Sequence, residues 1–132
     1  MPGIDECLLA AMTLPGARGA AVVDWISGLA LGTAGESPSG DHEATAAETA
    51  ELARMAAEHT AFVPPDTPEP EKGAPPVEGV IVTAPGGHHL IHFVGGVLDS
   101  SVFVHLWIDR REGNLALARI RLREIAESLV LA

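Results

Sequence analysis

The chain is poor in the residues on which several large classes of protein depend. Its 132 residues include one cysteine, Cys7, so no disulfide can form within the chain. Only 8 residues are Lys or Arg against 18 Asp or Glu, which leaves a net charge of −10. A nucleic-acid-binding surface needs clustered basic residues to neutralise phosphates. We therefore expect no nucleic-acid partner.

Long apolar runs are also missing. No stretch approaches the roughly 20 apolar residues that are needed to cross a bilayer. The first six residues include two acidic and no basic side chains, and the apolar residues 8–12 are too few for the core of a signal peptide. We expect a cytoplasmic protein without direct membrane insertion, folded as one domain over residues 1–132.

The sequence also lacks the signatures of common catalytic sites. It has no Walker A sequence, and neither Ser100 nor Ser101 lies in a nucleophile elbow. Cys7 has no histidine near it in the sequence, so a small buried apolar role is the default. Glu69 and Glu71 belong to a proline-rich stretch that offers no rigid support for acid–base chemistry. We therefore predict no catalytic and no cofactor-binding residues, and a protein that is not an enzyme.

The pattern of apolar residues predicts eight secondary-structure elements. Helical spacing predicts helices over residues 4–12, from Asp41 or Thr45 to about Ala61, and from Asn114 to the C-terminus. Thr45 and Glu48 have the spacing of a capping box. Runs of β-branched and apolar residues predict strands at residues 19–24, 29–33, 77–84, 88–94 and 101–108.

The order of these elements is α-β-β-α-β-β-β-α. The last strand is apolar on both faces, which favours a central strand covered from both sides. We therefore predict an α+β fold, an α/β sandwich in which a five-stranded antiparallel sheet carries helices on both faces. Residues 63–76 hold six of the ten prolines and are predicted to form an exposed connector within the domain.

Six histidines raise the question of a metal site. His88 and His92 share one face of a strand but lie about 13 Å apart at roughly 3.3 Å per residue, so they cannot bind one ion together. His89 points to the opposite side. A site would need His88 or His92 to meet His105 on a neighbouring strand, together with a carboxylate. Solvated or hydrogen-bonded histidines are the favoured interpretation, with a pH-sensitive surface as the alternative. We predict no metal site.

Two further features are candidates for interaction. Five of the eight basic residues lie between Arg110 and Arg123, where they form either a solvated helix face or a patch for an acidic partner. The solvated face is the favoured interpretation. Trp25 at a predicted hairpin tip is either tucked under the hairpin or an exposed aromatic anchor.

Several motifs resemble the roadblock/dynein light chain family of small dimeric scaffold proteins. They are residues 16–24 (GARGAAVVD) with Gly28, residues 29–35 (LALGTAG), residues 77–83 (VEGVIVT) and residues 114–125 (NLALARIRLREI). The last motif is most similar to actinobacterial members that are encoded near a sensor kinase and a Ras-like GTPase. The resemblance implies a profilin-like roadblock fold. It also implies a homodimeric scaffold that binds and regulates a small Ras-like GTPase, stimulates GTP hydrolysis in a signalling operon, and joins a sensor histidine kinase complex.

The family fold further implies that an edge strand over residues 77–83 pairs with its twin, while the two central helices pack together. The residues agree, because an edge strand with Val80, Ile81 and Val82 is a liability unless it is covered. The predicted dimer interface comprises Ala46, Ala50, Leu52, Ala53, Met55, Ala57, Val80, Ile81 and Val82. The GTPase would dock on the paired central helices, at Glu48, Glu51, Arg54, Glu58 and His59. Arg54 is also a candidate for an arginine that reaches into the GTPase.

Two alternatives from other classes stay open. The first is a domain that senses a small ligand bound between sheet and helix, which an internal pocket would support. The second is a pure adaptor for a sensor kinase, without any effect on nucleotide turnover.

Overall fold

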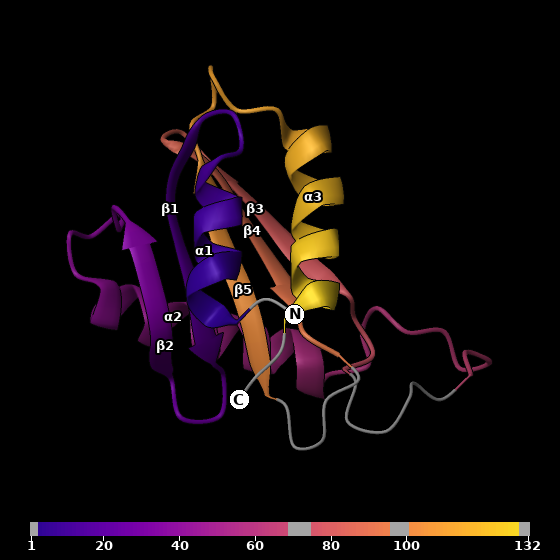
Figure 1. Ribbon diagram of the computed structural model, residues 1–132. Helices are drawn as coiled ribbons and strands as arrows, with labels where there is room; N and C mark the ends of the chain where they lie inside the picture. The colour runs from indigo at the N-terminus through magenta and orange to yellow at the C-terminus, as the bar shows by residue number, and fades with distance from the viewer. Residues whose placement is uncertain (1–2, 69–74, 96–100, 130–132) are drawn as a thin grey trace.

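The computed structural model describes residues 3–68, 75–95 and 101–129, and it confirms the predicted order of elements (Figure 1). The elements are α1 (Ile4–Met12), β1 (Ala17–Asp24), β2 (Leu29–Gly35), α2 (His42–Glu58), β3 (Gly79–Ala84), β4 (Gly87–Phe93), β5 (Val102–Ile108) and α3 (Leu115–Ser128). Within the expected connector, the described residues 63–68 and 75–76 contain no helix or strand. The predictions about Glu69, Glu71 and Ser100 lie outside the described residues.

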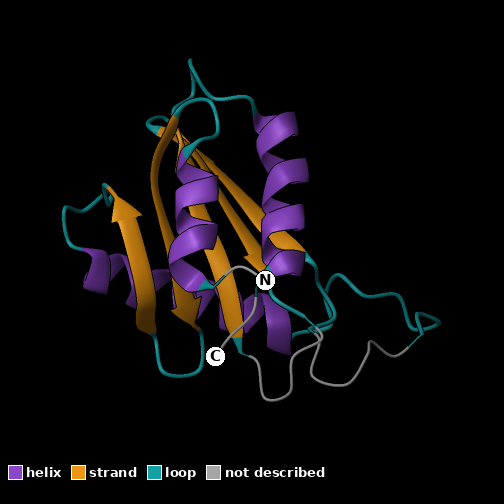
Figure 2. Ribbon diagram, in the orientation of Figure 1, coloured by secondary structure: helices purple, strands orange, loops and turns teal. Residues whose placement is uncertain are grey.

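The five strands form one antiparallel sheet in the order β2-β1-β5-β4-β3. β5 is the central strand, and all seven of its residues are buried, as its apolar sequence predicted. β2 and β3 are the two edges. Helices α1 and α3 lie on one face of the sheet and α2 on the other, which confirms the predicted sandwich (Figure 2).

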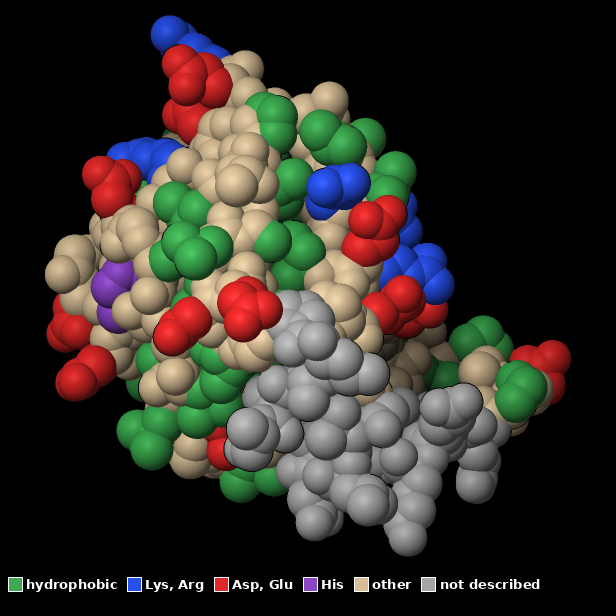
Figure 3. All heavy atoms as spheres, in the orientation of Figure 1, with side chains coloured by type: hydrophobic (Ala, Val, Ile, Leu, Met, Phe, Trp, Pro, Cys, Tyr) green, Lys and Arg blue, Asp and Glu red, His purple; other side chains and the backbone are tan. Residues whose placement is uncertain are grey.

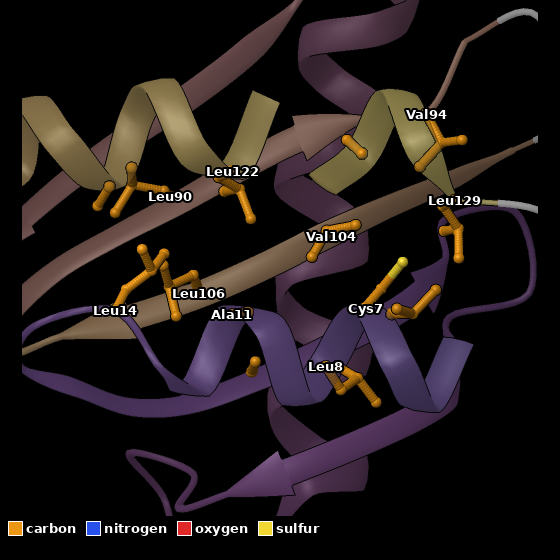
Figure 4. Close-up of a cluster of buried hydrophobic side chains, with 14 of the residues drawn as sticks. Cys7, Leu8, Ala11, Leu14, Leu90, Val94, Val104, Leu106, Leu122 and Leu129 are labelled. Atoms are coloured by element: carbon orange, nitrogen blue, oxygen red, sulfur yellow. The ribbon is translucent and has the colours of Figure 1, made fainter. Parts of the chain in front are cut away.

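The core beneath α1 and α3 is built from large aliphatic side chains. Leu8 from α1 and Leu122 from α3 pack against Leu90, Val104 and Leu106 of the sheet (Figure 4). Burial of each such side chain contributes roughly 1.5–3 kcal/mol, so this layer is the main apolar source of stability.

The core beneath α2 is thinner. Ala46, Ala50 and Ala53 recur on one side of the helix and are 2%, 0% and 0% exposed, packed against Val23 and Phe103. Methyl groups let the helix axis come close to the sheet, so the alanine stripe packs fully against the sheet of its own chain.

The cap of α2 differs from the predicted capping box. The Asp41 carboxylate accepts hydrogen bonds from the backbone N–H groups of Glu43 (2.9 Å) and Ala44 (3.4 Å), which makes Asp41 the N-cap. Thr45 lies inside the helix, and its hydroxyl is 2.6 Å from that of Ser37. At the other end α2 stops at Glu58, before the expected Ala61, because His59 has an extended backbone (φ −101°, ψ 149°).

Two tight turns shape the edges of the sheet. Gly28 has φ 77° and closes the β1–β2 turn, where its N–H donates to the Asp24 carbonyl at 2.8 Å. Pro85 and Gly86 connect β3 to β4, since Ala84 pairs directly with Gly87. β3 is the last strand of the sheet, because it pairs with β4 alone among the described strands. Among the described residues, no helix is long and apolar enough to cross a membrane.

Candidate protein-interaction surface

Strand β3 is paired along one side only among the described strands. It pairs with β4 through Val80–Ile91, Ile81–Leu90 and Val82–His89. Ile81 and Val82 remain 43% and 38% exposed. An edge strand with exposed β-branched side chains is a template for pairing with another chain. The predicted position of the edge strand is therefore correct.

Alternate residues of β3 belong to opposite faces of the sheet. Val80 packs against the core beneath α2, and Val82 is two residues further along the same face. Ile81 faces the side of α1 and α3, where its pairing partner Leu90 is buried. The α2 face of the sheet therefore ends in Val82, a half-exposed apolar residue.

The outward side of α2 presents apolar side chains in an acidic setting. Leu52 and Met55 are 38% and 62% exposed. With Glu48 and His59, which are also exposed, they follow the spacing i, i+4, i+7 and i+11 along one ridge of the helix and its C-cap. Helix α2 carries four glutamates, Glu43, Glu48, Glu51 and Glu58, against the single basic residue Arg54. We call Leu52, Met55, Val82 and the surrounding glutamates the α2 surface.

Three of the predicted interface residues do not belong to this surface. Ala46, Ala50 and Ala53 are fully buried against their own sheet, so they cannot contact a second chain in this structure. Ala57 is half-buried and also packs against the inner core. The sequence could not distinguish these uses, because a small-residue stripe fits a sheet as well as a second helix.

Arg54 is directed toward its own chain. Its Nη1 donates a hydrogen bond of 2.7 Å to the carbonyl oxygen of Trp25 in the β1–β2 turn. The Trp25 ring is half-buried and makes an edge-to-face contact with Phe93, with 6.5 Å between ring centroids. Trp25 is therefore packed under the hairpin and is not an exposed aromatic anchor. Arg54 ties α2 to this turn and is not an outward-reaching arginine.

A row of rings lies on the same face of the sheet, next to Val82. The Arg18 guanidinium carbon is 4.0 Å from the centroid of the Trp107 ring, which stacks on His89 (5.8 Å, 11°). His89 in turn stacks on His105 (5.2 Å, 23°), and a hydrogen bond of 3.0 Å joins His89 Nδ1 to His105 Nε2. The sequence did not reveal this row, because it depends on the register that sets His89 opposite Trp107.

The histidine geometry corrects one detail of the sequence analysis. His105 meets His89, whereas a metal site was expected to need His88 or His92, which lie on the other face with Leu90. Burial, reinforced by His89 and His42, lowers the pKa of His105 to about 3. Burial, with His88 adding to it, also lowers the pKa of His89. In the described parts of the chain, no three His, Cys, Asp or Glu side chains are grouped to hold a metal ion.

Cys7 is enclosed between α1 and α3. It is 2% exposed, and its Sγ is 3.9 Å from the carbonyl oxygen of Ile125. Burial raises the pKa of its thiol, which opposes formation of the reactive thiolate. Cys7 therefore acts as a small apolar core residue, as its position in the sequence indicated.

Comparison with known proteins finds similarity in structure and none in sequence. No family model matches the chain, and no curated protein matches it by sequence. A solved structure of Myxococcus xanthus MglB superposes with a TM-score of 0.71 at 16% identity, covering 96% of this chain and 86% of MglB. A structure of MglB with a tetrameric arrangement also has a TM-score of 0.71 at 16% identity, covering 95% of this chain and 83% of the other. The chain has the MglB fold, in agreement with the roadblock-type fold expected from its motifs.

Proposed function

We propose that this protein is a homodimeric scaffold that binds and regulates a small Ras-like GTPase through its paired α2 helices. The observation that carries the proposal is the exposed apolar pair Leu52 and Met55 on α2, in a fold whose sheet also has an open edge at β3. The MglB fold supports it, because the resemblance to the roadblock family predicted both this fold and the GTPase partner.

The proposed dimer is built by β3 pairing with its twin across a two-fold axis. Main-chain pairing would satisfy the open edge and cover the backbone of Val80, Ile81 and Val82. Leu52, Met55 and the outer side of Ala57 would approach the second α2, whereas the buried alanines would remain in their own core. Such an interface buries roughly 1,200–2,000 Å² when it has the usual size.

The GTPase is proposed to dock on the two α2 helices together. The polar positions there are Glu48, Glu51, Glu58 and His59, so a basic patch on the GTPase is the complementary surface. Arg54 donates a hydrogen bond to the Trp25 carbonyl, which supports a GTPase-regulating role without an inserted arginine. We therefore propose that regulation works by ordering the GTPase's own switch segments, with no catalytic group supplied by this chain. A sensor kinase is not part of the proposal, since no feature of the described residues points to one.

The dimer is tested by size-exclusion chromatography with light scattering at tens of micromolar. The wild type is expected at twice the mass of one chain, and Val82→Lys, which places a charge on the edge strand, as a monomer. The control is Thr33→Lys, which adds the same charge to an exposed site on the other edge strand, β2. A monomeric wild type, or a dimer indifferent to Val82→Lys, would contradict the proposed interface.

The GTPase function is tested by single-turnover hydrolysis with candidate small Ras-like GTPases. We expect the wild type to raise the rate more than about tenfold, which corresponds to about 1.4 kcal/mol of transition-state stabilisation. Met55→Glu, which places a charge where the second α2 would approach, should abolish this effect by separating the paired helices. Leu9→Glu on the exposed side of α1 and Arg54→Ala should preserve it. Binding with an unchanged rate would instead identify a pure adaptor. Absence of binding to any of these GTPases would reject the proposal.

A further inference from the structure

A groove lies on the face of the sheet opposite α2. It has a volume of about 710 Å³ and runs between α3 and the β3–β4 hairpin. Leu90 and Ile81 form its floor, and Ile120 with Ala116 forms the α3 wall. Helix α3 packs on β4 and β5, so the floor next to β3 remains open to solvent.

The walls of the groove expose large apolar side chains. Ile120 is 58% exposed and Ile81 is 43% exposed, although each faces the groove from a regular element. Leu117, one turn before Ile120 on α3 and outside the groove lining, is 37% exposed. Neighbouring exposed aliphatic residues rimmed by charges are typical of a surface that another molecule covers.

The charge of the groove is opposite to that of the whole chain. Arg119 and Arg123 line it one helical turn apart, and Glu78 is the only acidic side chain among the lining residues. Arg123 is paired with Glu127 at 3.2 Å, whereas Arg119 has no ion pair within the described residues. In a chain with a net charge of −10, Arg119, unpaired among the described residues, leaves a small local excess of positive charge in the groove, which favours an acidic ligand. Figure 3 shows basic, acidic and hydrophobic side chains close together on the flank formed by α3.

The shape of the groove favours a segment of protein over a small molecule. Small-molecule sites enclose most of the ligand's surface. Here the apolar walls are about half exposed, and the recognition groups are side chains spread along a helix. Such open apolar grooves are typical of sites that accept the apolar face of an amphipathic helix.

We propose that this groove binds an acidic amphipathic helix of a partner protein. Its Asp or Glu side chains would pair with Arg119 and Arg123, which are about 6 Å apart along the α3 axis, close to one turn of the bound helix. Its apolar residues at i, i+3 and i+4 would cover Ile120 and Ile81. The proposal does not depend on the GTPase, because the groove and the α2 surface lie on opposite faces of the sheet.

The experiment is a selection of random 16-residue peptides displayed on phage against the full-length protein. The selected sequences should be rich in Asp and Glu, with Leu, Ile or Phe at helical spacing. The same selection is run on the double variant Arg119→Glu/Arg123→Glu, for which the acidic preference should disappear. The matched control is Arg110→Glu/Arg111→Glu, which changes the net charge equally at two exposed residues before α3 and should keep the preference.

Synthetic copies of the selected peptides then test the apolar contact by fluorescence anisotropy. Ile120→Ser should weaken binding at least about tenfold, the loss expected when a buried anchor worth more than about 1.4 kcal/mol is removed. Leu9→Ser removes an equally exposed aliphatic residue from α1 and should have no effect. If a charge-reversed variant fails to fold by circular dichroism, Arg119→Gln/Arg123→Gln replaces it with the same expectation.

Three outcomes would overturn the proposal. The first is a selection without acidic preference, or one that is indifferent to the groove variants. The second is loss of self-association in Ile120→Ser, which would assign the groove to a second copy of this chain. The third is displacement of the peptides by free phosphate or citrate at micromolar concentration, which would assign it to a small anion.

Discussion

Lowering the pH is expected to destabilise this protein through His105. The side chain is 4% exposed at the centre of the sheet, and burial together with His89 and His42 lowers its pKa to about 3. In the unfolded chain the same imidazole titrates near 6.5. Between these values the unfolded state binds a proton that the folded state does not. The stability contributed by the neutral ring is therefore complete above about pH 6.5 and is lost as the pH falls toward 3.

The size of the effect follows from this difference in proton binding. Between about pH 7.5 and pH 5, protonation of His105 in the unfolded chain alone lowers the free energy of unfolding by about 2 kcal/mol. His89 and His92 act in the same direction, since burial is the first cause that lowers the pKa of each. For a domain with a stability of roughly 5–15 kcal/mol, the loss is large enough to measure. Asp24, whose pKa is lowered by its hydrogen bonds with Ser101 and the turn, contributes only below this range.

Urea denaturation at fixed protein concentration measures this effect at a series of pH values. The wild type should lose at least about 2 kcal/mol between pH 7.5 and 5, and His105→Gln should lose about 2 kcal/mol less over the same range. The change in the free energy of unfolding with pH is compared between the wild type and His105→Gln, so the comparison holds even if the variant is less stable at every pH. The control His59→Gln removes an exposed histidine at the end of α2. Equal pH slopes in the wild type and His105→Gln would refute the reasoning.

Two further predictions concern the two cores. Ala53→Leu, which forces a larger side chain beneath α2, should lower the free energy of unfolding by about 1–3 kcal/mol. The control Ala47→Leu, on the exposed side of α2, should change it by less than about 0.5 kcal/mol. Equal effects of the two variants in thermal melts would mean that the alanine stripe is not packed on the sheet. Cys7 should react with iodoacetamide in the native protein at least about a hundredfold more slowly than in 6 M guanidinium, because the thiol is buried and its raised pKa disfavours the thiolate. Mass spectrometry measures the rate of labelling, and rapid labelling of the native protein would contradict the packing of α1 against α3.

Much of the fold was predictable because its signals are local. The period of apolar residues marked each helix and strand, whereas the edge position of β3 was expected from the resemblance to the roadblock family. Element ends were less predictable, since they depend on single caps. Asp41 caps α2 while Thr45 bonds to Ser37, and both residues are chemically suitable caps.

The candidate surfaces were only partly predictable, because they depend on which side of each helix or strand packs against the rest of the chain. The alanines of α2 were suited to two kinds of neighbour, and the sheet of the same chain is the one they contact. Leu52 and Met55, which merely flank that stripe in the sequence, are the residues left exposed. The stacking of His89 on His105 required the strand register, which residue spacing within one strand cannot give.

The edge strand links the two proposed surfaces and also separates them experimentally. Val82 faces the side of α2, while its neighbour Ile81 lines the groove beside α3. A polar side chain at residue 82 should therefore weaken the α2-side contact first, and one at residue 81 should weaken binding of the acidic helix first. If main-chain pairing with a twin also holds, the two grooves would flank the two-fold axis on one face, and the two α2 surfaces would meet on the other. Consecutive residues of one short strand would then act on partners bound to opposite faces of the same dimer.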